Sequence, residues 1–192
     1  MTFRVVVAED EALIRLDLVE MLNGAGYEVV GDATNGAQAI ELVRELKPDL
    51  AILDVKMPVL DGISAAEKIR GECAVLILTA FSQKELIERA NEAGAMAYVV
   101  KPFTLSELQP SIEIAIARHR QMKALETEVR DIHERLETRK LIDRAKGILM
   151  QAMKLSEADA FRWIQRTAMD KRVSMKEVAE AVIDPSRAQN WK

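Results

Sequence analysis

The chain has 192 residues, 49% of them hydrophobic and 30% charged, and its formal net charge is −4. This composition is typical of a folded globular chain and excludes an intrinsically disordered one. No apolar run approaches the ~20 residues that a membrane-spanning helix requires, so we expect no membrane partner. The single cysteine, and a beginning without the apolar segment of a signal peptide, lead us to expect a cytoplasmic protein.

Charge is distributed unevenly along the chain. Residues 1–117 contain 10 Lys and Arg against 19 Asp and Glu, residues 118–137 contain 5 of each class, and residues 138–192 contain 12 basic and 7 acidic residues. The mild overall charge therefore conceals an acidic first part and a basic last part. This asymmetry predicts two domains with different partners, the basic one suited to a polyanion.

The first 117 residues alternate short apolar runs with stretches of helical spacing. The runs expected to form strands are residues 5–8, 28–30, 50–53, 75–78 and 97–100. Helical spacing is seen, for example, at Leu13, Leu16, Val19 and Leu22. Continuous apolar strands separated by helices predict a parallel sheet covered on both faces. We therefore expect an α/β, doubly wound (βα)5 domain over residues 1–117.

A helical connector is predicted over residues 118–137. Apolar residues there follow spacings of three and four, the pattern of a coiled-coil seam: Met122, Leu125, Val129, Ile132 and Leu136. We expect this seam to join two copies of the chain in a homodimer. The alternative is that the same stripe packs on the first domain of its own chain.

Residues 138–192 are predicted to form an all-α, three-helix bundle with a short polar tail. Ser156 and Ser174 are N-cap candidates for the second and third helices, and Asp184-Pro185 should end the third. The apolar residues expected to pack between these helices are Ile142, Ala145, Leu149, Phe161, Ile164, Ala168, Met175, Val178, Ala179 and Val182.

Polar residues follow the predicted strands at the edge where open α/β sheets bind ligands. Glu9 and Asp10 come after the first strand, Asp54 ends the third, Thr79 ends the fourth, and Lys101 follows the fifth. Converging carboxylates are unfavourable unless a cation neutralises them, and their oxygens suit Mg²⁺. A carboxylate nucleophile, Mg²⁺ and a lysine together predict the chemistry of an aspartyl phosphate.

These elements resemble the receiver domain of two-component response regulators over roughly residues 3–120. The residues that carry the resemblance are Glu9-Asp10, Asp54, Lys56-Met57-Pro58, Asp61-Gly62, Thr79-Ala80 and Lys101-Pro102-Phe103. The resemblance implies a flavodoxin-like fold and a sensor histidine kinase that phosphorylates Asp54. We expect the Asp61-Gly62 pair to serve only the turn.

The same resemblance implies roles for the other pocket residues. Those implied to hold Mg²⁺ are Glu9, Asp10, Asp54 and the backbone carbonyl of Lys56. Thr79 and Lys101 are implied to bind the phosphoryl oxygens, Tyr98 stands at the family's aromatic switch position, and the Lys101-Pro102 bond is expected to be cis. Glu9 stands where Asp is more usual, although it keeps the charge. The alternative is a degenerate receiver that keeps the fold without phosphorylation.

The basic end resembles an ANTAR domain over about residues 137–183. The residues that carry this resemblance are 138–150, Ser156-Glu157, Ala160-Phe161, Ile164, Ala168-Met169 and Val178-Ala179. The resemblance implies binding of RNA hairpin loops and transcription antitermination. The RNA contacts expected from it are Arg139, Arg144, Lys146, Arg162 and Arg166.

Two positions depart from this second family. Lys154 stands where many members have Gly, so we expect the turn after the first helix of the bundle to end differently. Gln165 stands where many members have a basic residue. Trp163 allows two interpretations, as a core or interface residue or as a platform on which an RNA base stacks.

The combined prediction is a response regulator that accepts a phosphoryl group at Asp54 and is not a turnover enzyme. Phosphorylation would control RNA binding, and with it antitermination, by biasing a two-state element. Two alternatives stay open. One is a DNA-binding transcription factor, and the other is a phosphorylation-dependent adaptor whose helical end binds only protein.

Overall fold

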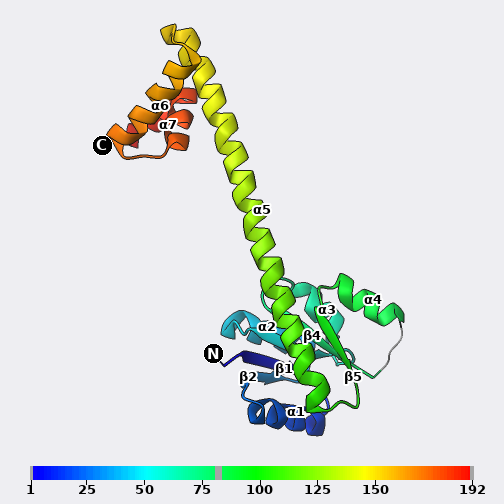
Figure 1. Ribbon diagram of the computed structural model, residues 1–192. Helices are drawn as coiled ribbons and strands as arrows, with labels where there is room; N and C mark the ends of the chain where they lie inside the picture. Colours follow the sequence, from blue (N-terminus) through cyan, green and yellow to red (C-terminus); the bar gives the residue numbers. More distant parts are fainter. Residues whose placement is uncertain (1, 81–83, 191–192) are drawn as a thin grey trace. The chain divides into compact units, whose positions relative to one another are not determined.

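The computed structural model of the chain describes residues 2–80 and 84–190, and the side chains of residues 84–87 and 188–190 lie outside that description. The chain divides into two compact units, Met1–Ala124 and Leu125–Lys192 (Figure 1). In the described part, no helix is both long and apolar enough to cross a membrane.

The first unit is built on a five-stranded parallel sheet. Its strands are β1 (Arg4–Ala8), β2 (Glu28–Ala33), β3 (Leu50–Asp54), β4 (Ala74–Thr79) and β5 (Ala97–Val100), in the spatial order β2-β1-β3-β4-β5. Every residue of β3 and β4 is buried. This confirms the doubly wound fold, because strands buried on both faces have continuous apolar sequences.

Helices cover both faces of this sheet. They are α1 (Ala12–Gly24), α2 (Gly36–Leu46), α3 (Gly62–Lys68), α4 (Lys84–Glu92) and α5 (Leu105–Met153). One core cluster includes Val43 of α2 and Ile63 of α3, and the other includes Leu18 of α1 and Ile112 of α5. The two clusters take alternate residues of β1, β3 and β4, so these three central strands are packed on both faces.

Helix α1 does not bury the four residues whose spacing indicated it. Leu18 and Leu22 are buried, but Leu13 is 78% exposed and Leu16 is 63% exposed. Each three-residue step falls about 60° short of a full helical turn, so residues spaced by three drift around the helix. The spacing predicted the helix correctly, but it does not indicate which of these residues are buried.

Helix α5 contributes to both units. Near its start, Leu108 and Ile112 are completely buried. Further along, Met122 packs against the core of the first unit, but the four other residues of the predicted seam are 49–61% exposed: Leu125, Val129, Ile132 and Leu136. These four side chains therefore form an apolar stripe exposed to solvent in this single chain.

The second unit is the predicted bundle, formed by the end of α5 with α6 (Glu157–Lys171) and α7 (Met175–Ile183), followed by a short 3-10 helix, η1 (Pro185–Asn190). The Ser156 hydroxyl accepts a hydrogen bond from the Asp159 amide, and Ser174 forms a full capping box with Glu177. Both predicted N-caps are thus confirmed, and α7 ends before Asp184 as expected.

The core of the bundle includes most of the predicted residues, but Phe161 is an exception. Ala160 and Ile164 are fully buried, whereas Phe161 is 41% exposed. Consecutive helical residues point about 100° apart, so burying Ala160 turns Phe161 toward the side of the core. Trp163 packs against the core cluster, which supports its interpretation as a core residue.

The turn after α5 differs from what the sequence led us to expect at Lys154. Lys154 has a φ of 55°, in the left-handed region that glycine adopts most easily. The helix therefore ends in a left-handed conformation that suits glycine, although lysine occupies the position. The expectation that replacing Gly with Lys would change how this turn ends was wrong.

Candidate functional site

The carboxyl ends of β1 and β3 bring three acidic side chains together. The two strands are neighbours, with Ala8 opposite Leu53, so the residues that follow β1 lie beside Asp54 at the end of β3. Oxygen atoms of Glu9, Asp10 and Asp54 all lie within 4.8 Å of one another. Glu9 and Asp54 are buried and Asp10 is exposed, so the cluster opens to solvent on one side.

Lys101 reaches into this cluster from the loop after β5. Its Nζ lies 2.5 Å from a carboxylate oxygen of Glu9 and 2.7 Å from one of Asp54. The Lys101 backbone amide donates a 2.7 Å hydrogen bond to the carbonyl of Thr79, and the Lys101-Pro102 bond is cis, as expected. The end of β4 therefore fixes the position of the lysine.

Burial and charge act in opposite directions on these groups. Burial raises the pKa of the Glu9 carboxyl, and the hydrogen bond from Lys101 offsets part of that rise. Burial would lower the pKa of Lys101, but its hydrogen bonds to Asp54 and Glu9 outweigh this, so its pKa lies above the ordinary value. A protonated Lys101 balances one of the three carboxylates.

The residual negative charge and the donor atoms fit a divalent cation. Carboxylate oxygens from three side chains are the hard ligands that Mg²⁺ prefers. Asp10 also lines a cavity of about 540 Å³ together with Lys56, Met57, Pro58 and Asp61. The cluster therefore has open space beside it on the side of the loop that follows β3.

The loop after β3 holds Asp54 in place. The Lys56 amide donates a 3.0 Å hydrogen bond to Asp54 Oδ2, and Asp61 caps α3 by accepting a bond from the Ser64 amide. A β-carbon built on Gly62 would lie 2.0 Å from the Asp54 carbonyl oxygen. Gly62 therefore does more than shape a turn, because it lets α3 start against the backbone of Asp54.

Thr79 and Tyr98 occupy different environments. Thr79 is 2% exposed at the end of β4, one residue beyond the pairing of Leu78 with Asp54. Tyr98 lies on the edge strand β5, is 44% exposed, and belongs to neither core cluster. The structure thus places Thr79 at the end of the strand beside β3 and leaves Tyr98 accessible on the edge of the sheet.

Only two of the five basic residues predicted to contact RNA line the same groove in the second unit. Arg139 and Lys146 line one groove, whereas Arg144, Arg162 and Arg166 lie outside its lining. The Lys146 side chain is only 14% exposed, and its Nζ lies 2.7 Å from oxygens of both Asp143 and Glu157. The Asp143 pKa is lowered, first by the hydrogen bond from Lys146 and also by the charge of Arg139.

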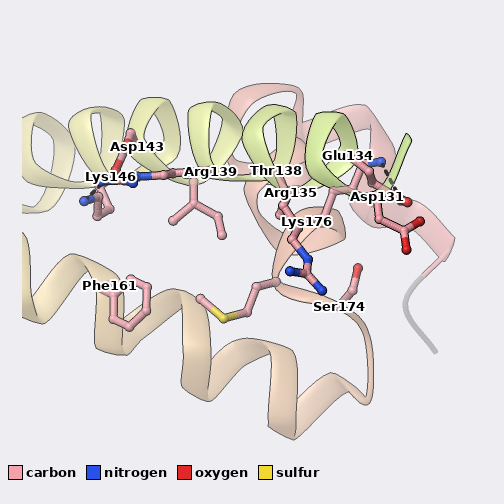
Figure 2. A pocket seen from close by; sticks show the side chains of 12 residues that line it. Asp131, Glu134, Arg135, Thr138, Arg139, Asp143, Lys146, Phe161, Ser174 and Lys176 are labelled. Atoms are coloured by element: carbon pink, nitrogen blue, oxygen red, sulfur yellow. Dashed lines mark ion pairs between the residues drawn. The ribbon is translucent and has the colours of Figure 1, made fainter. Parts of the chain in front are cut away.

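That groove has a volume of about 710 Å³ and lies between α5, α6 and the start of α7 (Figure 2). Its lining also includes two cations and an aromatic ring that were not among the predicted contacts: Arg135, Lys176 and Phe161. Arg135 could have been found from the sequence, because positions 135, 139, 142 and 146 recur at helical spacing. Lys176 and Phe161 carry no such signal, since only the folding of the bundle brings them opposite α5.

Comparison with known proteins gives two family matches. The sequence model of the response regulator receiver domain matches residues 5–113, and that of the ANTAR domain matches residues 130–183. The first match contains the acidic cluster and Lys101. The second contains all of the residues that line the groove.

Individual relatives agree with these matches. Transcriptional regulatory protein PdtaR of Mycobacterium tuberculosis is 57% identical over 183 residues, which cover 94% of this chain and 89% of the relative. Chemotaxis protein CheY of Thermotoga maritima is 39% identical over 108 residues, 55% of this chain and 90% of the relative. The solved receiver domain of the response regulator NarL from Mycobacterium tuberculosis superposes with a TM-score of 0.58 at 32% identity, covering 60% of this chain and 97% of that chain.

Proposed function

The chain belongs to the response regulators that combine a receiver domain with an ANTAR domain, and we propose that phosphorylation of Asp54 controls RNA binding by its C-terminal bundle. Membership of this family makes the protein a phosphorylation-regulated response regulator. Its receiver domain implies a histidine kinase as partner, and its ANTAR domain implies RNA.

One observation carries the proposed chemistry, namely the contact of Lys101 with both Asp54 and Glu9. In the proposed transfer, an Asp54 oxygen forms a bond to phosphorus while the bond from phosphorus to the kinase histidine breaks, and the imidazole leaves. Lys101 then holds a phosphoryl oxygen with its ammonium group. The Thr79 hydroxyl donates a hydrogen bond to a second phosphoryl oxygen. When bound, Mg²⁺ would supply positive charge to the transferring group.

The proposed metal ligands are Glu9, Asp10, Asp54 and the backbone carbonyl of Lys56. Their role is to orient charge, since phosphoryl transfer depends mainly on positioning and electrostatic stabilisation. Tyr98 is the proposed switch residue, because its exposed position on the sheet edge leaves the ring free to move when Thr79 gains a phosphoryl partner. The protein is a phosphoryl acceptor in this scheme, and the only chemistry proposed for it is Mg²⁺-dependent self-phosphorylation and dephosphorylation at the receiver.

The phosphorylation step can be tested on the whole chain with phosphoramidate and Mg²⁺. Intact-mass spectrometry should detect one added phosphoryl group on the native chain and none on Asp54→Asn. Asp61→Asn is a matched control, because Asp61 caps α3 and does not belong to the acidic cluster. Equal phosphorylation of Asp54→Asn would overturn the assignment.

The proposed output is the binding of RNA hairpin loops, and through it transcription antitermination. Residues 138–192 carry 12 basic and 7 acidic residues, and the relative PdtaR is named a transcriptional regulatory protein. Loops expose unstacked bases that side chains can reach, unlike the narrow major groove of an RNA duplex. Arg139, Arg144, Lys146, Arg162 and Arg166 are the proposed contacts.

Filter retention of RNA hairpins, duplex RNA and duplex DNA at several salt concentrations tests this output. The expected order is strongest retention of hairpins, with affinity falling as salt rises. Preference for duplex DNA would favour a DNA-binding transcription factor. Retention of none of the three would favour an adaptor that binds only protein.

We propose that the receiver occupies residues 1–117, the linker residues 118–137 and the RNA-binding domain residues 138–192. We further propose that the apolar seam of this linker, on α5, joins two copies of the chain when Asp54 is phosphorylated. The four exposed seam residues support this, because a solvent-exposed apolar stripe is stabilised by a second helix. Analytical ultracentrifugation with beryllofluoride and Mg²⁺ should show an increase in mass that Ile132→Glu abolishes. An unchanged mass would exclude dimerisation as the switch.

A further inference from the structure

The groove in the second unit has three different walls. One wall is a single face of α5, the second is α6 at Phe161, and the third is the start of α7 from Ser174 to Lys176. Figure 2 shows Phe161 and Arg135 projecting from opposite walls into the space between the helices. Its volume of about 710 Å³ lies within the ~300–1,000 Å³ range of small-molecule sites.

Phe161 gives the groove a flat apolar surface. The ring is 41% exposed although its neighbour Ala160 is fully buried, and the apolar residues Ile142 and Met175 line the same groove. Trp163, by contrast, is committed to the core cluster. Phe161 is therefore the aromatic ring that this groove offers to a ligand.

The cations of the groove differ in how far they are already neutralised. Lys146 pairs with Asp143 and Glu157, and Lys176 lies 3.8 Å from Glu134. Arg135 and Arg139 take part in no ion pair within the described residues. Two guanidinium groups without an ion-pair partner thus line the same groove as the aromatic ring. Guanidinium binds phosphate oxygens in a bidentate manner.

We propose that this groove binds one unpaired nucleotide of an RNA loop, with its base stacked on Phe161 and its flanking phosphates held by Arg135 and Arg139. The proposal rests on the proposed RNA-binding function and adds a base-binding subsite to it. Stacking on an aromatic side chain suits any unstacked base.

The acidic residues of the groove explain why a single nucleotide fits better than a continuous backbone. Asp131, Glu134 and Asp143 line the same space as the arginines, so a row of phosphates along the groove would meet negative charge. A neutral base avoids this repulsion. Carboxylates can also accept hydrogen bonds from the exocyclic amino groups of a base, so the mixed charge favours a base inside the groove and phosphates at its rim.

The test measures binding of the full chain to an RNA hairpin selected from a pool with randomised loops. Phe161→Ala should weaken binding by roughly 5- to 150-fold, the range expected for one stacked base. Phe161→Trp should restore it, whereas Phe161→Leu should not, because leucine keeps apolar volume but lacks an aromatic face. Met153→Ala removes an exposed apolar side chain outside the groove and serves as the matched control.

Two further measurements separate stacking from a change in the fold. Replacing loop nucleotides one at a time by abasic sites should identify one position whose loss equals that of Phe161→Ala and adds nothing to it. Arg139→Gln should reduce the slope of log affinity against log salt by about 1, and Phe161→Ala should leave the slope unchanged. Lys140→Gln, which lies outside the groove lining, is the control for charge.

The outcomes distinguish the subsite from the function on which it rests. Hairpin binding that survives Phe161→Ala at the level of Met153→Ala would overturn the subsite and leave the RNA-binding function intact. The subsite is also overturned if Phe161→Leu binds as well as Phe161→Trp. Failure of the native chain to bind any hairpin would overturn both.

Discussion

A β-carbon on residue 62 would lie 2.0 Å from the carbonyl oxygen of Asp54, so Gly62 and the proposed phosphoacceptor are in direct backbone contact. No ordinary non-bonded contact is that short, and the obstructing atom belongs to the backbone of a buried strand. The start of α3 and the position of Asp54 therefore depend on each other.

Gly62→Ala should destabilise the receiver domain by about 1–3 kcal/mol or more, because the added methyl group forces α3 away from β3. Urea unfolding followed by circular dichroism measures the loss. Gly24→Ala is the matched control, since nothing lies within 4 Å of a β-carbon at that position. Equal stability of the two variants would contradict the close contact.

Lys101→Ala should destabilise the metal-free receiver by ~3–5 kcal/mol, because it leaves the buried carboxylates of Glu9 and Asp54 without their cation. Adding Mg²⁺ should recover part of the loss. The double variant Glu9→Gln with Lys101→Ala should be more stable than Lys101→Ala alone, since it removes one of the uncompensated charges. A double-mutant cycle in urea, with no coupling between the two positions, would refute this reasoning.

Lys154→Gly should stabilise the C-terminal bundle by about 1 kcal/mol, because a non-glycine residue in the left-handed conformation is disfavoured by roughly 1–2 kcal/mol. Thermal unfolding followed by circular dichroism gives the shift in Tm. Lys154→Ala removes the charge but keeps the β-carbon, so it should give no comparable gain. If it stabilises as much as glycine does, backbone conformation is not the cause.

Cys73 should resist thiol reagents in the folded protein. Burial raises the pKa of its thiol to about 12, and the residue is 2% exposed. Labelling with iodoacetamide at pH 8 should therefore be slow in buffer and fast in urea, and the reagent reports one site because the chain has one cysteine. Rapid labelling of the native chain would show that the strand start at Cys73 opens readily.

The Cys73 thiol also contributes to the pH dependence of folding stability. Its pKa is raised in the folded state, so folding favours the protonated thiol, and this contribution is complete below the unfolded pKa of about 8.5. It declines as pH rises from there toward 12. The stability of Cys73→Ala relative to the native chain, measured in urea at pH 7.5 and 10, should improve at the higher pH.

The acidic cluster was predictable because its geometry follows from strand order. Glu9, Asp54 and Lys101 each stand at the end of an apolar run, and parallel strands bring such ends to one edge of a sheet. The cis bond before Pro102 was an expectation of the family resemblance, and the structure has it.

Which side chains of a helix face the core was less predictable from the sequence. Leu13 and Leu16 have helical spacing but are exposed, because spacing alone does not say which face of α1 meets the sheet. Phe161 is a large apolar residue in a helix of the bundle, and it lies outside the core because Ala160 and Ile164 occupy the contact between helices. Hydrophobicity indicates that a helix packs, whereas the partners it meets decide which residues are covered.

The sequence by itself determined the division into an acidic α/β domain and a basic helical one, the strand ends that form the carboxylate cluster, and the caps of α6 and α7. These features depend on residues close in the chain or on the fixed direction of parallel strands. Only the tertiary structure decided that Gly62 touches the Asp54 backbone, that Lys146 is already paired, and that Phe161 lines one groove with Arg135 and Arg139. Such contacts join helices distant in sequence, and their geometry arises from how the helices pack.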